Sequence, residues 1–209
     1  TVLELILSNH PQDCLTCGKS GNCELQALAD QFHLRDIRYK GRKFNHAVDT
    51  SSYSIIRDMN KCIMCRRCEM ACNQVQTVGV LSNTERGFDS VMDTAMHRPL
   101  LETKCTFCGQ CTAVCPTGAL MEMNHLDKVW KVLNDPTKFV IVQTAPAVRV
   151  AIGEMFGLDP GTIATGQMVA GLRALGFNRV FDTNFGTDLT VWEEATEFIT
   201  RLEEGGRLP

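Results

Sequence analysis

The stretch Cys62-Ile63-Met64-Cys65-Arg66-Arg67-Cys68-Glu69-Met70-Ala71-Cys72 decides the fold of this chain, together with a second run that begins 43 residues later. The second run is Cys105-x2-Cys108-x2-Cys111-x3-Cys115-Pro116. A run with this spacing holds a [4Fe–4S] cluster with three cysteines, and its fourth cysteine binds the neighbouring cluster. We therefore expect one cluster on Cys62, Cys65, Cys68 and Cys115, and another on Cys72, Cys105, Cys108 and Cys111.

A third block precedes the two runs and uses the remaining cysteines of the eleven in the chain. It reads His10-x3-Cys14-x2-Cys17-x5-Cys23. A lone histidine is more often structural or exposed, but a four-iron cluster needs four ligands and this block has only three thiols. His10 is the economical fourth ligand. The three blocks together supply twelve ligands and predict three [4Fe–4S] clusters.

Other uses of the cysteines fit the sequence less well. Disulfides are disfavoured because the count is odd, the C-x2-C spacing is tight and no secretory signal is visible. Reduced thiols in a cytoplasmic protein fit better. Zinc is the stronger alternative, since two C-x2-C pairs can form a four-cysteine zinc site, but zinc sites seldom use the x2, x2, x3 spacing.

Composition excludes two classes of partner. The net charge of -3 gives no sign of a basic patch, so we expect no nucleic acid. No stretch approaches the roughly 18 unbroken apolar residues of a membrane helix, so we expect no membrane span. The chain opens with Thr1 and without methionine, and we interpret it as a segment of a longer polypeptide.

The overall pattern predicts an α+β protein of three domains. Residues 1–41 form the one-histidine, three-cysteine cluster module, with helices near residues 2–7 and 24–33 around the cysteine loop. Residues 42–134 form a ferredoxin-like domain with two [4Fe–4S] clusters. In it we expect a strand at 54–57, a helix at 68–75, an insertion with short strands at 79–101, and an amphipathic helix at 124–133.

Residues 135–209 lack cysteine and predict the beginning of an α/β domain. The unbroken apolar run Phe139-Val140-Ile141-Val142 is typical of a parallel strand that is buried on both faces. A helix is expected from Pro146, a second at 167–175, a strand at 177–181 and a long helix from Asp188 to about Leu202. Glu194 and Glu197 share one face of this last helix, where the residues alone predict a solvated acidic surface.

The three cysteine blocks, in this order, resemble the amino-terminal electron conduit of three groups of proteins. These are [FeFe]-hydrogenases, the large iron–sulfur subunit of respiratory complex I, and NAD-linked formate dehydrogenases. The stretches Thr144-Ala145-Pro146-Ala147-Val148-Arg149, Phe181 to Thr190 and Glu193 to Glu197 are similar to [FeFe]-hydrogenase catalytic-domain motifs. The chain is thus identified as resembling the catalytic subunit of a multi-subunit, NAD(P)-linked [FeFe]-hydrogenase.

The resemblance carries further expectations. It implies that His10 is a cluster ligand, that Glu194 and Glu197 belong to the proton route, and that Ala145, Pro146 and Ala147 line the catalytic pocket. The catalytic di-iron H-cluster and a [2Fe–2S] cluster are expected outside this segment, with a Thr-Ser-Cys motif just after Pro209. The segment alone should not make hydrogen.

The implied activity of the complete protein is reversible reduction of protons to H2. The implied partners are flavin- and NAD(P)-binding iron–sulfur subunits or ferredoxin. Two alternatives stay open at this point. One is the iron–sulfur part of an NAD-linked formate dehydrogenase or of complex I. The other is a stand-alone polyferredoxin carrier, which would not need the α/β residues.

Overall fold

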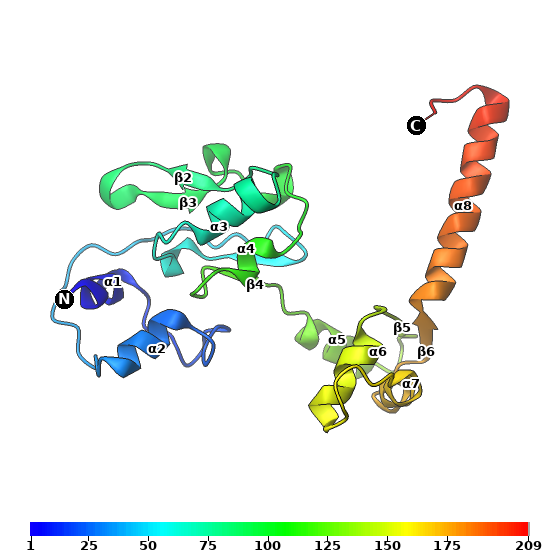
Figure 1. The fold of residues 1–209 in the computed structure, drawn as a ribbon, viewed down its shortest axis with the longest axis horizontal. Helices are drawn as coiled ribbons and strands as arrows, with labels where there is room; N and C mark the ends of the chain where they lie inside the picture. The colour runs from blue at the N-terminus through cyan, green and yellow to red at the C-terminus, as the bar shows by residue number, and fades with distance from the viewer. Residues whose placement is uncertain (209) are drawn as a thin grey trace. The chain divides into compact units, whose positions relative to one another are not determined.

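The computed structural model describes residues 1–208, which form two compact units (Figure 1). The first unit comprises residues 1–124, and the second begins at residue 125. The helix that we assigned to the end of the ferredoxin-like domain, α5 (Leu126–Leu133), belongs to the second unit. The mixed helix and strand content predicted from the sequence is confirmed.

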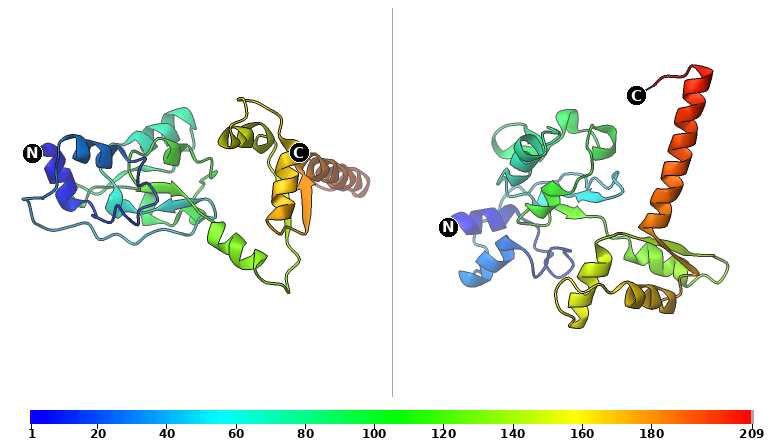
Figure 2. Two further views of the ribbon diagram at one scale, coloured as in Figure 1. Left: turned by 90° about the horizontal axis from the view of Figure 1, so that it is seen from below. Right: turned by 45° about the vertical axis from the view of Figure 1, so that its right-hand side comes forward.

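The first unit opens with two short helices on either side of the first cysteine loop. They are α1 (Val2–Asn9) and α2 (Glu24–Gln31), and both confirm helices predicted from the sequence. Helix α2 is joined to the ferredoxin-like part by a backbone hydrogen bond of 3.0 Å, from the Glu24 N–H to the Pro116 carbonyl. Figures 1 and 2 show these blue helices at one side of the cyan and green part of the same unit.

The rest of the first unit contains two cysteine loops. Each loop is followed by a short helix and is accompanied by one strand of an antiparallel pair. Its elements are β1 (Ile55–Arg57), α3 (Arg67–Met70), a π-helical turn (Ala71–Val75), β2 (Ser82–Thr84), β3 (Val91–Asp93), α4 (Gln110–Ala113) and β4 (Leu120–Glu122). Strands β1 and β4 pair antiparallel, with Ile56 opposite Met121. Strands β2 and β3 pair antiparallel within the predicted insertion. Single 3₁₀ turns lie at Met59–Lys61, Gly87–Asp89, Ala95–His97 and Leu100–Glu102.

The core of this unit lies between the two strand pairs and the cysteine loops. Ile55 and Leu120 come from the paired strands β1 and β4, and Met92 comes from β3. All three are at most 2% exposed. Cys68 and Cys115 are buried in the same cluster. The core residues therefore fix the walls against which the cysteine side chains rest.

The second unit contains a pair of parallel strands with helices. Its elements are α5, β5 (Ile141–Thr144), α6 (Val148–Ala151), a 3₁₀ turn (Ile152–Phe156), α7 (Thr165–Ala174), β6 (Arg179–Asp182) and α8 (Thr183–Glu204). The predicted order of strands and helices is confirmed. The first strand, however, begins at Ile141 and not at Phe139, and α8 begins five residues before Asp188. The Asp182 carboxylate accepts a hydrogen bond of 3.0 Å from the Asn184 N–H, and this cap explains the earlier start.

The expectation that the apolar strand is buried on both faces is wrong. Phe139 is 69% exposed and Ile141 is 58% exposed. Strand β5 pairs with β6 alone in the described residues, so neither face is covered as it would be in a wider sheet. In residues 1–208, no helix has both the length and the apolar character of a bilayer span.

Candidate metal centres

Eight of the cysteines line two small cavities in the first unit, and each cavity mixes the two runs. One cavity is lined by Cys62, Cys65, Cys68 and Cys115, with Met59, Met92 and Leu120 among its apolar walls. The other is lined by Cys72, Cys105, Cys108 and Cys111, with Ile55 and Leu81 among its walls. The fourth cysteine of each run thus lies with the first three of the other run. These sets are the ones that the spacing predicts.

The two cysteine loops have the same backbone conformation. The second residue after the first cysteine, Met64 or Phe107, has a positive φ of 55° or 54°. The N–H of that residue donates to the sulfur two positions earlier, at 3.4 Å in both loops. Two residues further on, Arg66 and Gly109 also have positive φ, at 61° and 77°. The repeat in sequence is therefore a repeat in structure, with N–H groups directed at the sulfur atoms.

The pKa values of the buried thiols reflect the same two sets of cysteines. Burial, together with the nearby Cys62, Cys115 and Cys65 thiols, raises the pKa of Cys68 to about 12. Burial, together with Cys105, Cys108 and Cys72, raises the pKa of Cys111 to about 11. Two or more thiolates in so dry a space repel one another, so each set needs a cationic group to hold it in the ionised form. Four thiolate donors around an apolar cavity fit a [4Fe–4S] cluster.

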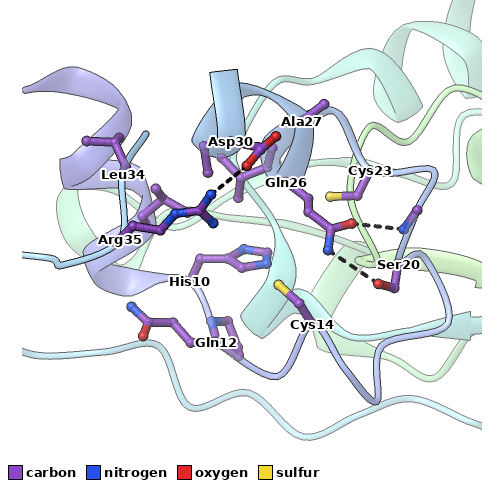
Figure 3. A pocket seen from close by; sticks show the side chains of 15 residues that line it. His10, Gln12, Cys14, Ser20, Cys23, Gln26, Ala27, Asp30, Leu34 and Arg35 are labelled. Atoms are coloured by element: carbon purple, nitrogen blue, oxygen red, sulfur yellow. Dashed lines mark hydrogen bonds and ion pairs between the residues drawn. The ribbon is translucent and has the colours of Figure 1, made fainter. Parts of the chain in front are cut away.

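The amino-terminal cavity contains His10, Cys14 and Cys23 (Figure 3). The His10 Nδ1 is buried and has no hydrogen-bond partner in the described residues. Burial lowers the pKa of His10, which favours the neutral imidazole that can bind a metal. Gln26 closes the cysteine loop: its Oε1 accepts from the Gly21 N–H at 2.9 Å, and its Nε2 donates to Ser20 Oγ at 3.3 Å.

Cys17, the remaining cysteine of this block, is not among the residues that line the cavity. It lies at the boundary with the ferredoxin-like part, where a Cβ placed on Gly118 would be 2.9 Å from the Cys17 sulfur. The structure therefore brings His10, Cys14 and Cys23 together and places Cys17 on the side that faces Gly118. In residues 1–208, no three His, Cys, Asp or Glu side chains converge on a single metal-ion position.

Two ion pairs join the amino-terminal block to the ferredoxin-like part. Lys61 Nζ lies 2.9 Å from Asp13 Oδ2, and Arg67 donates to both carboxylate oxygens of Glu24 at 2.5 and 2.9 Å. Burial lowers the pKa of Lys61, but its hydrogen bond to Asp13 and the charges of Cys17, Asp13 and Asp58 raise it by more. Lys61 therefore stays protonated.

The hydrogenase-like motifs of the second unit meet at one end of its strand pair. Thr144 ends β5 and lies opposite Asp182, which ends β6. Arg149, from the first motif, donates to both carboxylate oxygens of Asp182 at 2.9 Å. Ala145, Pro146 and Ala147 form the exposed turn that follows β5 at this edge. The carboxyl ends of parallel strands are where α/β proteins place ligand sites.

Glu194 and Glu197 lie further along α8, and both are exposed. The Glu197 carboxylate accepts a hydrogen bond from Arg201, one turn further along the helix. Among the described residues, neither glutamate forms a hydrogen bond or an ion pair with the Ala145–Ala147 turn. The structure therefore does not bring the five predicted catalytic residues together.

Sequence reasoning missed Lys61 and Gly118, which lie where the two cysteine-bearing parts meet. A weak signal was available, because Lys61 directly precedes Cys62 and Gly118 follows Cys115 by three residues. It also missed Arg57, which is buried between Asp49 and Asp93. A single buried arginine cannot be recognised in a strand pattern.

Three sequence families match parts of the chain. Residues 138–209 match the iron-only hydrogenase large subunit, C-terminal domain. Residues 1–38 match the NADH-ubiquinone oxidoreductase-G iron–sulfur binding region, and residues 61–119 match the 4Fe–4S dicluster domain. The match of residues 138–209 to a hydrogenase domain weakens the alternatives of complex I, a formate dehydrogenase and a free carrier.

Curated relatives include two hydrogenases. The chain is 58% identical over 202 residues to the NADP-reducing hydrogenase subunit HndD of Solidesulfovibrio fructosivorans, with 97% of the chain and 34% of the relative covered. It is 36% identical over 205 residues to iron hydrogenase 1 of Clostridium pasteurianum, with 98% of the chain and 36% of the relative covered. The chain therefore spans about a third of the length of these relatives.

One similar solved structure is the NAD+-reducing [NiFe]-hydrogenase in the H2-reduced state. It matches with a TM-score of 0.54 and 28% identity, covering 58% of this chain and 52% of that chain. The fold and the cysteine cavities define an iron–sulfur electron-transfer protein with a dicluster ferredoxin-like domain. Residues 138–209 match the iron-only hydrogenase large-subunit family, and nearly the whole chain is similar to two hydrogenases, as the resemblance of its sequence predicted.

Proposed function

We propose that this chain is the electron relay and the start of the catalytic domain of an [FeFe]-hydrogenase that reversibly reduces protons to H2. Its three clusters would carry electrons between redox partners and a catalytic H-cluster bound by other residues of the complete protein. The names of an NADP-reducing and an NAD+-reducing relative favour partners that bind NAD(P). The resemblance of the sequence adds flavin-binding iron–sulfur subunits, with ferredoxin as the other candidate. Reduced thiols fit a cytoplasmic location.

The single observation that carries this proposal is the sorting of eight cysteines into two mixed sets. Cys115 lies with Cys62, Cys65 and Cys68, and Cys72 lies with Cys105, Cys108 and Cys111. Crossed sets of this kind are what two adjacent [4Fe–4S] clusters require. We further propose that His10, Cys14, Cys17 and Cys23 hold a third cluster.

When bound, the clusters supply one-electron transfer. The residues of the chain hold and insulate them. Met64 and Phe107 direct backbone N–H groups at ligand sulfurs, which stabilises the negative charge there. The apolar walls exclude water from the side of each cavity on which Cys68 or Cys111 lies. Because the pKa values of these thiols are raised, cluster binding must release protons, and loading should be favoured at higher pH.

For protons, we propose that Glu194 and Glu197 act as a relay in the complete enzyme and that Ala145, Pro146 and Ala147 line its catalytic pocket. Support comes from the similarity to hydrogenase motifs. The Glu197 ion pair with Arg201 would have to open for the carboxylate to accept a proton. In the full-length subunit, Glu197→Gln should cut hydrogen turnover steeply, while the relay clusters keep their spectra.

Glu193→Gln is the matched control, because Glu193 is also exposed on α8, one turn before Glu197, but the resemblance does not place it in the proton route. It should be nearly neutral. Equal turnover in the Glu193 and Glu197 variants would return Glu194 and Glu197 to the role of a solvated helix surface.

Iron and acid-labile sulfide analysis of anaerobically purified protein tests the relay itself. Three clusters require about 12 iron and about 12 sulfide per chain. A content of about 8 iron, or stoichiometric zinc, would refute the three-cluster relay.

A further inference from the structure

We propose that Lys61 is a positioning residue between two of the cluster sites. Its buried ammonium group holds the His10 block against the ferredoxin-like part and raises the reduction potentials of the clusters on both sides. This inference rests on the proposed function, since it assumes a cluster on His10, Cys14, Cys17 and Cys23 and another on Cys62, Cys65, Cys68 and Cys115.

The position of Lys61 connects the two sites through the chain itself. Lys61 directly precedes Cys62, and its ion-pair partner Asp13 directly precedes Cys14. The Lys61 side chain is only 10% exposed, and its Nζ lies 2.9 Å from Asp13 and 3.7 Å from Asp58. A lysine this buried contributes a fixed charge that water screens poorly.

The aliphatic part of the Lys61 side chain also lies where the His10 block meets the ferredoxin-like part. A Cβ on Gly118 would lie 3.3 Å from Lys61 Cδ and 2.9 Å from Cys17 Sγ. The lysine stem and the cysteine sulfur thus meet over the backbone of Gly118. Thr117, which is 1% exposed, fixes the other end by donating from Oγ1 to the Lys61 carbonyl at 2.8 Å.

The sign of the effect follows from the charges. Each cluster becomes more negative when it gains an electron, so a nearby cation stabilises the reduced form and raises the potential. Replacing Lys61 by a neutral residue removes this cation and leaves the Asp13 and Asp58 carboxylates without it. Both changes act in the same direction and lower the potentials of the two flanking clusters.

The internal repeat provides a matched control. Lys104 precedes Cys105 as Lys61 precedes Cys62, but Lys104 is exposed. Lys104→Gln removes the same charge at the same distance along the chain from a ligand cysteine. Solvent and salt screen an exposed charge, so its removal should have little effect on the two clusters beside Lys61.

The test is a redox titration, followed by EPR, of the anaerobically purified chain and its Lys61→Gln and Lys104→Gln variants. Iron and sulfide are counted in each sample. With all three clusters present, Lys61→Gln should move two of the three midpoint potentials to more negative values, and Lys104→Gln should leave those two in place. Unchanged midpoints in a fully loaded Lys61→Gln protein, or the same two shifts in Lys104→Gln, would overturn the proposal.

Two further variants keep the test decisive if Lys61→Gln loses iron. Lys61→Arg keeps the charge and should retain all three clusters with midpoints close to those of the wild type. Asp13→Asn removes a partly exposed anion beside Lys61 and should raise the potential of the cluster in the His10 block. A lowered or unchanged midpoint in Asp13→Asn would refute the electrostatic role. A wild-type chain that lacks three clusters would instead refute the proposed function.

Discussion

Glu4 in α1 and Arg38, 34 residues later, form a two-pronged ion pair that closes the amino-terminal block. Arg38 Nε and Nη2 donate to the two Glu4 oxygens at 2.9 and 2.7 Å, and the Arg38 backbone N–H donates at 2.9 Å. Glu4 is 2% exposed, and it is the buried residue of the otherwise largely apolar helix α1. The side-chain and backbone hydrogen bonds from Arg38 lower the pKa of Glu4 to about 2.

We predict that Glu4→Gln loosens the amino-terminal block and speeds the loss of its cluster. The ratio of the release rates of variant and wild type should be the same at every pH from about 5.5 to 8. The pKa of Glu4 is lowered on folding, so its stabilising effect is complete above the ordinary carboxyl pKa and is lost only as the pH falls toward 2. Cluster release to a chelator, followed by visible absorbance, measures this. A difference between variant and wild type that grows or vanishes within that range would contradict the assignment. Asp30→Asn is the control, because Asp30 pairs with Arg35 on the exposed surface.

The crossed cysteine sets lead to a second prediction. Cys115→Ala should remove or convert the cluster on Cys62, Cys65 and Cys68, because Cys115 shares their cavity. Cys72→Ala should damage the cluster on Cys105, Cys108 and Cys111 instead. EPR-monitored titration should show that the two variants lose different midpoints. Loss of the same midpoint in both would refute the crossed assignment.

The sequence predicted the cysteine sets because the relevant information is local. A C-x2-C-x2-C loop must curl around one space, and the fourth cysteine lies outside it, in the π-helical turn in the first run and just past α4 in the second. The same sets line the two cavities, although their ligation of clusters stays a prediction. The contacts between Glu4 and Arg38 and between Asp13 and Lys61 were not predictable, since each depends on how distant segments pack. The exposure of Ile141 was also missed, because a strand's apolar pattern does not reveal whether neighbours cover it.

A third prediction concerns Arg57, which is 6% exposed and pairs with Asp49 and Asp93. Arg57→Leu leaves two carboxylates nearly buried without their cation, and we expect a loss of about 3–5 kcal/mol of stability. Arg42→Leu breaks an exposed pair with Asp89 and should cost at most about 1 kcal/mol. Urea unfolding followed by far-UV circular dichroism and by cluster absorbance compares the two. Similar midpoints for both variants would mean that the buried pairs contribute little.

The last prediction tests the close approach between Gly118 and Cys17. A methyl group on Gly118 would lie 2.9 Å from the Cys17 sulfur, and Lys61 Cδ at 3.3 Å blocks relaxation on one side. Gly118→Ala should therefore displace Cys17, reduce iron in the His10 block and weaken the magnetic coupling between its cluster and the neighbouring one. Gly41→Ala is the control, since a Cβ there meets nothing within 4 Å. EPR of the fully reduced proteins reports the coupling, and iron analysis reports occupancy. If Gly118→Ala matched Gly41→Ala in both measurements, the bare backbone at position 118 would not be required for Cys17 to reach its cluster.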